Sequence, residues 1–288
     1  MKSPNKNIED DIESAISMVN RSKVNERKRQ TKIQNAKNKK IAKNRKKRNR
    51  FLKWISIIAI VIIGLIFTFV SPLFNIKEIK VENNNILSTE KIISLSRLKK
   101  DQNIFRFLKA DVETHLKEDP YVESVKVSRE LPNTVKLEVK ERNRDFSVKF
   151  LNGFAFINNQ GYILEIVEDN AGVPILLGTE TPEEQFTPGN RLDNKDLKKL
   201  EVAIQVMKIA KENEIAEKIT SIDITNKNEY IIHLDADKKD AYLGDGSDLN
   251  TKILYIKVIM EQEADKEGTI FVNGDFSNKF KAYFREKV

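Results

Sequence analysis

The fold of the middle of this 288-residue chain is decided by the stretch Glu118-Asp-Pro-Tyr-Val-Glu-Ser-Val-Lys-Val-Ser-Arg-Glu-Leu-Pro-Asn-Thr-Val-Lys-Leu-Glu-Val-Lys-Glu-Arg142. Residues 122–127 are rich in valine, and residues 134–139 alternate apolar and polar side chains, as strands with one buried face do. Leu131-Pro132-Asn133 between them is a turn signal. We therefore predict two consecutive strands joined by this turn.

Upstream of these strands the sequence predicts one more strand and two helices. Residues 76–81 alternate roughly like a strand, and Asn83-Asn84-Asn85 breaks the pattern. Ser88 is placed to cap a helix, and a second helix is expected over 109–116, before Asp119-Pro120. The order β-α-α-β-β makes a compact module of about 70 residues, which is within the usual range of domain sizes.

Further upstream, residues 54–76 contain no charged side chain. At 1.5 Å per residue they form about 34 Å of helix, enough for a hydrocarbon layer of about 30 Å. We predict a transmembrane helix over 54–74. A buried core helix would show a polar face over this length, and a cleaved signal peptide would have a shorter apolar run, without the bulky Phe69 and Val70 near its exit.

The net positive charge of the chain comes from its first 53 residues. These hold 18 Lys and Arg against five Asp and Glu, whereas the remaining 235 residues hold 33 against 38. Arg27 to Lys53 alone contributes 14 basic residues and no acid, which places 1–53 in the cytoplasm and the rest outside. We predict a largely disordered tail attracted to anionic head groups rather than a nucleic-acid-binding arm.

Residues 145–288 read as a second module of short strands and two helices. Turns that contain Asn and Gly separate the first strands. A helix is expected over 193–213, where apolar residues recur on one face. A second helix is expected over 249–263. The strands are expected at 146–150, 153–157, 162–166, 219–224, 230–234, 241–244, 269–273 and 279–286. The fold class is therefore α+β, with a mixed second domain built on a mainly antiparallel sheet.

Few residues in the chain indicate catalysis, metal binding or cofactor binding. The absence of Cys excludes disulfides, thiolate zinc sites and Cys nucleophiles. His115 and His233 lie far apart, and no Ser-His-Asp or Walker-type pattern occurs. The Asp-rich segment 235–248 lacks the calcium-loop spacing. We expect no catalytic residue, metal, cofactor or small-molecule substrate, although a glycosidase-like pair of carboxylates stays open at this stage.

The last predicted strand is the remaining candidate for function. Phe280, Ala282 and Phe284 point to one side, and Lys281, Tyr283 and Arg285 to the other. A final strand at a sheet edge has unpaired backbone groups that can accept a strand from another chain. A shielded edge, whose lysines only prevent aggregation, explains the same pattern equally well.

Several motifs around the central strand pair resemble the FtsQ/DivIB family of cell division proteins, and DivIB of Gram-positive bacteria most. The resemblance rests on Pro120-Tyr-Val, on Val127-x-Arg129 followed by Leu131-Pro-Asn133, and on a strand that ends in Glu141-Arg142. It implies a POTRA domain over 75–144. The chain departs from the family in having Asn143 and Arg144 where a basic residue and Pro often follow.

The resemblance also implies a function. It identifies a non-enzymatic membrane scaffold of the divisome, single-pass and enriched at the septum, that binds FtsL and DivIC/FtsB-like partners and acts indirectly on a septal penicillin-binding protein. The family uses its C-terminal region to hold the DivIC/FtsB partner, which here implies the residues Phe280, Lys281, Ala282, Tyr283, Phe284 and Arg285, supported by Phe271 and Asn273. The alternatives are a POTRA-bearing accessory of polypeptide export and a membrane-anchored cell-wall hydrolase.

Overall fold

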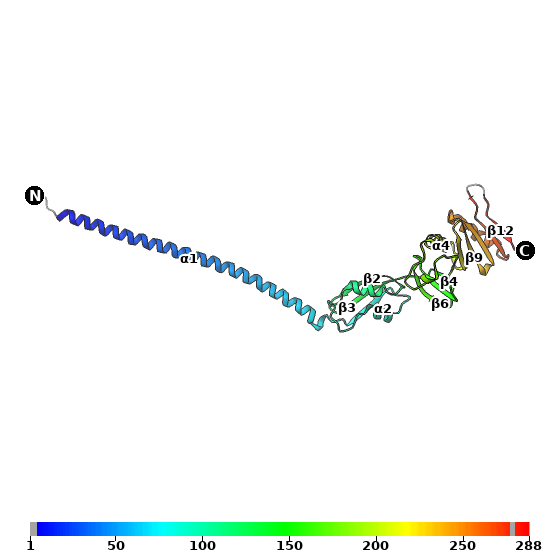
Figure 1. Ribbon diagram of the computed structural model, residues 1–288, viewed down its shortest axis with the longest axis horizontal. Helices are drawn as coiled ribbons and strands as arrows, with labels where there is room; N and C mark the ends of the chain where they lie inside the picture. The colour runs from blue at the N-terminus through cyan, green and yellow to red at the C-terminus, as the bar shows by residue number, and fades with distance from the viewer. Residues whose placement is uncertain (1–4, 277–279, 288) are drawn as a thin grey trace. The chain divides into compact units, whose positions relative to one another are not determined.

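A computed structural model describes residues 5–276 and 280–287 of the chain (Figure 1). The chain divides into two units between Ser71 and Pro72. The first unit is one helix. The second holds two hydrophobic cores, each built mainly by one of the two domains that the sequence predicts after the apolar helix. The core of the first domain also includes Phe156 and Leu164 of the second domain.

Helix α1 runs without interruption from Asn5 to Val70. The structure differs here from the prediction of a largely disordered tail over 1–53. The physical reason is local: no proline or glycine occurs between Asn5 and Ile63, and the tail is rich in Lys and Arg, which favour the helical backbone. The apolar segment therefore continues a basic helix instead of starting a new one.

The C-terminal part of α1 is apolar on every side. Ile60, Ile63 and Phe67 are each at least 60% exposed. Among the described residues, α1 provides the one helix that is long and apolar enough to cross a membrane. It ends at Val70, before the predicted end at 74, because Pro72 cannot continue the helix; a 3-10 turn, η1, covers Pro72–Phe74.

The first domain has the predicted element order. Strand β1 (Glu78–Glu82) precedes helices α2 (Thr89–Ser96) and α3 (Lys109–Leu116), and strands β2 (Val122–Glu130) and β3 (Thr134–Glu141) follow. In the sheet β3 lies in the middle, parallel to β1 and antiparallel to β2. Ser88 caps α2, as predicted, and its side chain accepts a hydrogen bond from the Lys91 N–H at 3.2 Å.

The core of the first domain lies between this sheet and the two helices. Alternate residues of β3 are buried, which is what the period of two in the sequence predicts. The fully buried side chains include Ile76, Ile92, Ile104, Leu116, Val135 and Leu137.

The second domain is built on a nine-stranded sheet in the order β12-β11-β10-β9-β8-β7-β4-β5-β6. Most neighbouring strands are antiparallel, and β4–β7, β7–β8 and β10–β11 are the parallel pairs, so the predicted mixed α+β fold is confirmed. The strands are β4 Phe146–Phe150, β5 Gly153–Ile157, β6 Ile163–Val167, β7 Ile175–Leu177, β8 Ser221–Asn226, β9 Glu229–Leu234, β10 Lys239–Gly244, β11 Gly268–Phe271 and β12 Tyr283–Glu286.

Two longer helices cover one face of this sheet. Helix α4 (Asn194–Glu212) packs against β8 and against α5 (Leu249–Gln262), and α5 packs against β10. Their buried faces meet the sheet in one cluster that includes Ala203, Ile222, Ile232, Ala241, Ile253 and Ile256. Short 3-10 turns η2 (Glu183–Gln185), η3 (Ala216–Lys218) and η4 (Asp235–Asp237) join the larger elements.

Candidate functional site

Strand β12 is the last strand of the nine-stranded sheet, and only β11 pairs with it among the described residues (Figure 1). The two strands are antiparallel, with Phe284 opposite Ile270. The Lys287 N–H donates to the Glu267 carbonyl at 2.9 Å. Since bonded and non-bonded pairs alternate along an antiparallel ladder, the N–H and C=O groups of Phe284 and Glu286 point away from β11. Within the described part of the chain, the edge thus presents a row of unpaired backbone groups.

The side chains near this edge alternate between the two sheet faces. Ala282 and Phe284 pack against the hydrophobic core of the second domain, and Tyr283 and Arg285 are exposed. Lys281, which precedes β12, is exposed as well, and Phe280 is half-buried. The strand itself begins only at Tyr283, whereas the predicted strand began at Lys279, which lies outside the described residues.

An aromatic row crosses the exposed face of the sheet toward the edge. Tyr242 of β10 stacks on Phe271 of β11 at 5.3 Å, and Phe271 stacks on Tyr283 of β12 at 4.8 Å. The guanidinium of Arg285 lies 4.9 Å from the centre of the Phe271 ring. The structure thus brings Phe271, Tyr283 and Arg285 together, as the sequence prediction grouped them.

The grouping in the structure differs from the predicted one at two residues: one predicted member lies elsewhere, and one unpredicted residue joins. Asn273 lies beyond the end of β11, where it approaches Gly244 rather than β12. Tyr242 joins the aromatic row although it was not predicted, because its place depends on the parallel pairing of Tyr242 with Phe271. Nothing in the spacing of the two residues along the chain indicates that pairing.

A second cluster of aromatic rings connects the region before β12 with helix α5. Phe280 lies edge-on to Phe276 at 5.4 Å, and Phe276 stacks on Tyr255 of α5 at 5.1 Å. Tyr255 is 42% exposed, and Leu254 and Val258 of the same helix are also exposed. An exposed apolar strip of α5 therefore lies next to the residues that lead into β12.

The motif residues of the first domain hold its loops in place. The Glu141 carboxylate accepts hydrogen bonds from three consecutive N–H groups, those of Asn85, Ile86 and Leu87, at 2.7, 2.7 and 2.9 Å. Arg142 donates to the Pro120 and Val122 carbonyls. The Glu-Arg pair at the end of β3 is thus explained by hydrogen bonding within the domain.

Arg129 has the same kind of role for the loop before α3. It donates to the carbonyls of Ile104 and Phe107 at 2.8 and 2.6 Å, and its guanidinium covers the Phe107 ring. A guanidinium suits this task because it offers several donors in a fixed plane. The motif residues therefore stabilise the fold and leave the edge of β12 as the candidate site.

Side chains of both domains meet where the first domain joins the second. The Tyr121 hydroxyl donates to Glu165 at 2.5 Å and accepts from Arg144 at 2.7 Å, and Arg144 pairs with Glu165 at 2.6 Å. Burial and the Glu165 hydrogen bond together raise the pKa of Tyr121 well above its usual value. Arg144, where the family often has a different sequence, thus contributes to the contact between the domains.

The two histidines serve no common site. His233 Nδ1 lies 2.6 Å from Asp240 Oδ1 on neighbouring strands of the second domain, whereas His115 is on α3 of the first domain. In the part of the chain that the structure describes, no group of three His, Asp or Glu side chains could hold a metal ion. The Asp-rich segment forms local turns, in which Asp245 accepts from Ser247 and pairs with Lys252.

Comparison with known proteins agrees with this architecture. The family model described as "POTRA domain, FtsQ-type" matches residues 74–142. The chain is 31% identical to cell division protein DivIB of Clostridium acetobutylicum over 57% of this chain and 60% of that protein. It is 31% identical to DivIB of Clostridium botulinum strain Hall, over 63% of this chain and 72% of the relative.

A more distant relative extends the comparison to the other branch of the family. The cell division protein FtsQ of Corynebacterium glutamicum is 20% identical over 74% of this chain and 90% of its own length. The matched region of the family model coincides with the β1-α2-α3-β2-β3 domain and its Glu141-Arg142 end. The chain therefore belongs to the FtsQ/DivIB family of cell division proteins.

Proposed function

We propose that this protein is a non-enzymatic, single-pass membrane scaffold of the divisome that binds FtsL and DivIC/FtsB-like partners. In this role it assembles or stabilises the septal peptidoglycan synthesis complex. The single observation that carries the proposal is the unpaired outer edge of β12, with exposed aromatic and basic side chains beside it.

The edge is suited to strand addition by a partner segment. Backbone groups of Phe284 and Glu286 provide hydrogen bonds that depend little on the partner's sequence, whereas Tyr283 and Arg285 provide selectivity. Rings and guanidinium groups of this kind are common binding hot spots. The exposed strip Leu254, Tyr255 and Val258 on α5 adds apolar surface for the part of the partner that continues past the strand.

Membrane anchoring makes a small interface sufficient. When α1 and a partner's own membrane helix share one bilayer, the second contact becomes effectively intramolecular and the local concentration rises. A four-residue strand edge and a few flanking side chains then support a stable complex.

Removing one outward-facing N–H tests strand addition directly. We expect Glu286→Pro to weaken capture of the same organism's DivIC-like protein about tenfold, since a lost bond and a steric block cost about 1.4 kcal/mol or more. Glu286→Ala is the matched control, because it removes the same side chain and its 3.8 Å contact with Lys266 but keeps the N–H. The measurement is affinity of the full chains in detergent, with a thermal melt to check folding.

A side-chain variant tests selectivity at the same edge. Tyr283→Lys should also weaken capture, because it removes the ring stacked on Phe271 from an exposed position. If Glu286→Pro and Tyr283→Lys both bind the partner as tightly as the unaltered chain, the edge is not the binding site. Turnover of purified peptidoglycan by the chain would contradict the non-enzymatic role.

The proposed orientation can be measured without background because the chain has no cysteine. In intact spheroplasts, a membrane-impermeant maleimide is expected to label Lys126→Cys, at an exposed position of β2, and to leave Lys39→Cys of α1 unlabelled until the membrane is opened. The opposite pattern of labelling would place the two domains in the cytoplasm and exclude the proposed role.

A further inference from the structure

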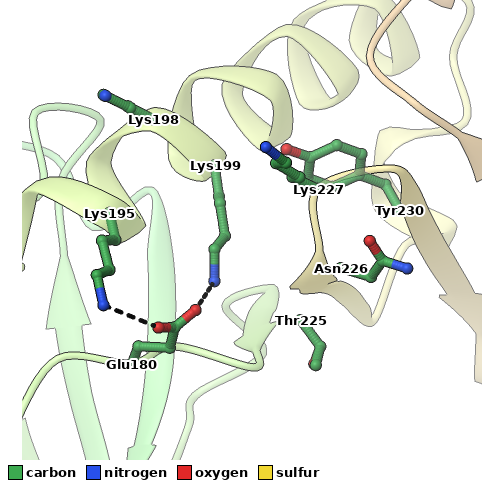
Figure 2. A pocket seen from close by; sticks show the side chains of 8 residues that line it. All are labelled: Glu180, Lys195, Lys198, Lys199, Thr225, Asn226, Lys227 and Tyr230. Atoms are coloured by element: carbon green, nitrogen blue, oxygen red, sulfur yellow. Dashed lines mark hydrogen bonds and ion pairs between the residues drawn. The ribbon is translucent and has the colours of Figure 1, made fainter.

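A cavity of about 580 Å³ lies in the second domain, away from the motifs that identify the family. Its walls come from the start of α4, from the segment after β7 and from the turn between β8 and β9 (Figure 2). The lining residues are Glu180, Lys195, Lys198, Lys199, Thr225, Asn226, Lys227 and Tyr230. Cavities of this size accommodate ligands larger than a single inorganic ion.

One wall is held rigidly by a buried carboxylate. Asp196 of α4 is fully buried and accepts from the Glu180 N–H, the Thr181 N–H and the Thr181 hydroxyl, at 2.6 to 3.0 Å. The wall also depends on Gly178, which has a φ of +79°; a Cβ there would lie 2.6 Å from the Thr225 backbone nitrogen. The cavity is therefore a fixed feature of the fold.

The cavity is strongly cationic. Four lysines line it, and Glu180 is the one carboxylate among the lining residues. Glu180 accepts from Lys199 at 2.7 Å and lies 3.7 Å from Lys195, as Figure 2 shows. Among the described residues, Lys198 and Lys227 form no ion pair and no hydrogen bond, so their charges are available to a ligand.

The position of these charges opposes the stability of the fold. Lys195 and Lys198 lie in the first two turns of α4, where the helix dipole disfavours cations. Burial acts to lower the pKa of Lys199, but its contacts with Glu180 and Asp196 outweigh burial and raise that pKa. An anion bound in the cavity would relieve this repulsion.

Lysine acts as a point charge for phosphate groups, and the two lysines without partners among the described residues come from different elements, Lys198 from α4 and Lys227 from the turn between β8 and β9. The lining also offers the hydroxyl groups of Thr225 and Tyr230 and the amide of Asn226, which suit the hydroxyl groups of a polyol or sugar. We infer that this cavity binds a phosphodiester-linked polyol or sugar chain, one repeat of which occupies the cavity. This site is separate from the partner-binding edge of β12.

The test uses the full chain in nanodiscs of zwitterionic phosphatidylcholine, titrated calorimetrically with a short synthetic poly(glycerol phosphate). The pocket variant carries Lys198→Gln with Lys227→Gln. The matched control carries Lys208→Gln with Lys211→Gln, which removes the same charge from exposed positions farther along α4. We expect saturable binding by the unaltered chain and the control, and binding about tenfold weaker or worse by the pocket variant.

Three results would overturn the inference: no saturable binding by the unaltered chain, equal weakening of binding in both double variants, or equally tight binding of a polyglutamate of matched charge. The first excludes the ligand, the second replaces the site by general electrostatic attraction, and the third excludes phosphate selectivity. Circular dichroism of both variants confirms that they are folded. Capture of the DivIC-like partner should be unchanged in the pocket variant, which separates this site from the proposed function.

Discussion

A chain carrying Asp196→Ala is expected to lose about 3–5 kcal/mol of unfolding free energy in the second domain, because a fully buried carboxylate is removed from its partners. Its oxygens accept from two backbone N–H groups and from the Thr181 hydroxyl, and Lys199 lies 3.7 Å away. Without Asp196 these donors and the buried ammonium group of Lys199 lose an acceptor, and the segment at Glu180 and Thr181 is released from α4.

Hydrogen exchange measures the local release of this segment, and chemical denaturation measures the loss of unfolding free energy. Exchange of the Glu180 and Thr181 amides should speed up strongly in Asp196→Ala, together with a lower denaturation midpoint by circular dichroism. Asp193→Ala is the control, because Asp193 caps the same helix through a single bond to the Lys195 N–H, a cap that contributes about 1 kcal/mol. Equal and small effects of the two substitutions would show that the buried network does not hold the wall of the cavity.

The second large effect is expected for Glu141→Ala in the POTRA domain, at about 2–3 kcal/mol. One carboxylate satisfies three consecutive N–H groups at the turn before α2, and alanine leaves all three without that acceptor. Loss of protection at the Asn85, Ile86 and Leu87 amides should accompany a lower midpoint of the first domain. The second domain should keep its hydrogen-exchange protection except around Phe156 and Leu164, since its other buried residues form a separate core.

Glu138→Ala on the same strand provides the comparison. Its carboxylate pairs with Lys126 and Lys136 on the exposed face of the sheet, and such pairs contribute little in water. We expect almost no change in the midpoint. Should Glu138→Ala destabilise the domain as much as Glu141→Ala, the hydrogen bonds to the turn would not be the reason for the Glu-Arg end of β3.

The order of elements in the POTRA domain was predictable because local signals agree there. Valine alternation, the Leu131-Pro132-Asn133 turn and the Ser88 cap each act within a few residues, and all appear in the structure. The alternation of Ala282, Tyr283, Phe284 and Arg285 was predictable for the same reason. Patterns with a short period show which face of an element is buried.

The positions of elements relative to one another were less predictable. The stacking of Tyr242 on Phe271 follows from parallel pairing between β10 and β11, which are separated along the chain by α5. The helical course of the basic tail does not follow from its charge composition, which is typical of disorder, but from the absence of proline and glycine between Asn5 and Ile63. Charge composition and backbone preference are different properties, and each has to be considered.

The cationic cavity could not be found from the sequence at all. Its lysines are distributed over α4 and the turn between β8 and β9, and lysine is common throughout the chain. Only the folded structure shows that Lys195 and Lys199 share Glu180, whereas Lys198 and Lys227 have no partner within the described part of the chain. The role of Asp196 was hidden for a similar reason, since a buried aspartate and a solvated one look the same in a sequence.

The parallel pairing of β1 with β3 has a mechanical consequence. The chain enters this pair from α1 at Glu78 and leaves it toward the second domain at Glu141, and the two strands run in register from Glu78 opposite Thr134 to Glu82 opposite Glu138. A pulling force between the anchor and the second domain would therefore shear all these rungs together instead of opening them one after another. Resistance to such a load depends on the rate of forced unfolding, and shearing several hydrogen bonds at once slows that unfolding, so this domain is suited to stay folded when the chain is pulled from both ends.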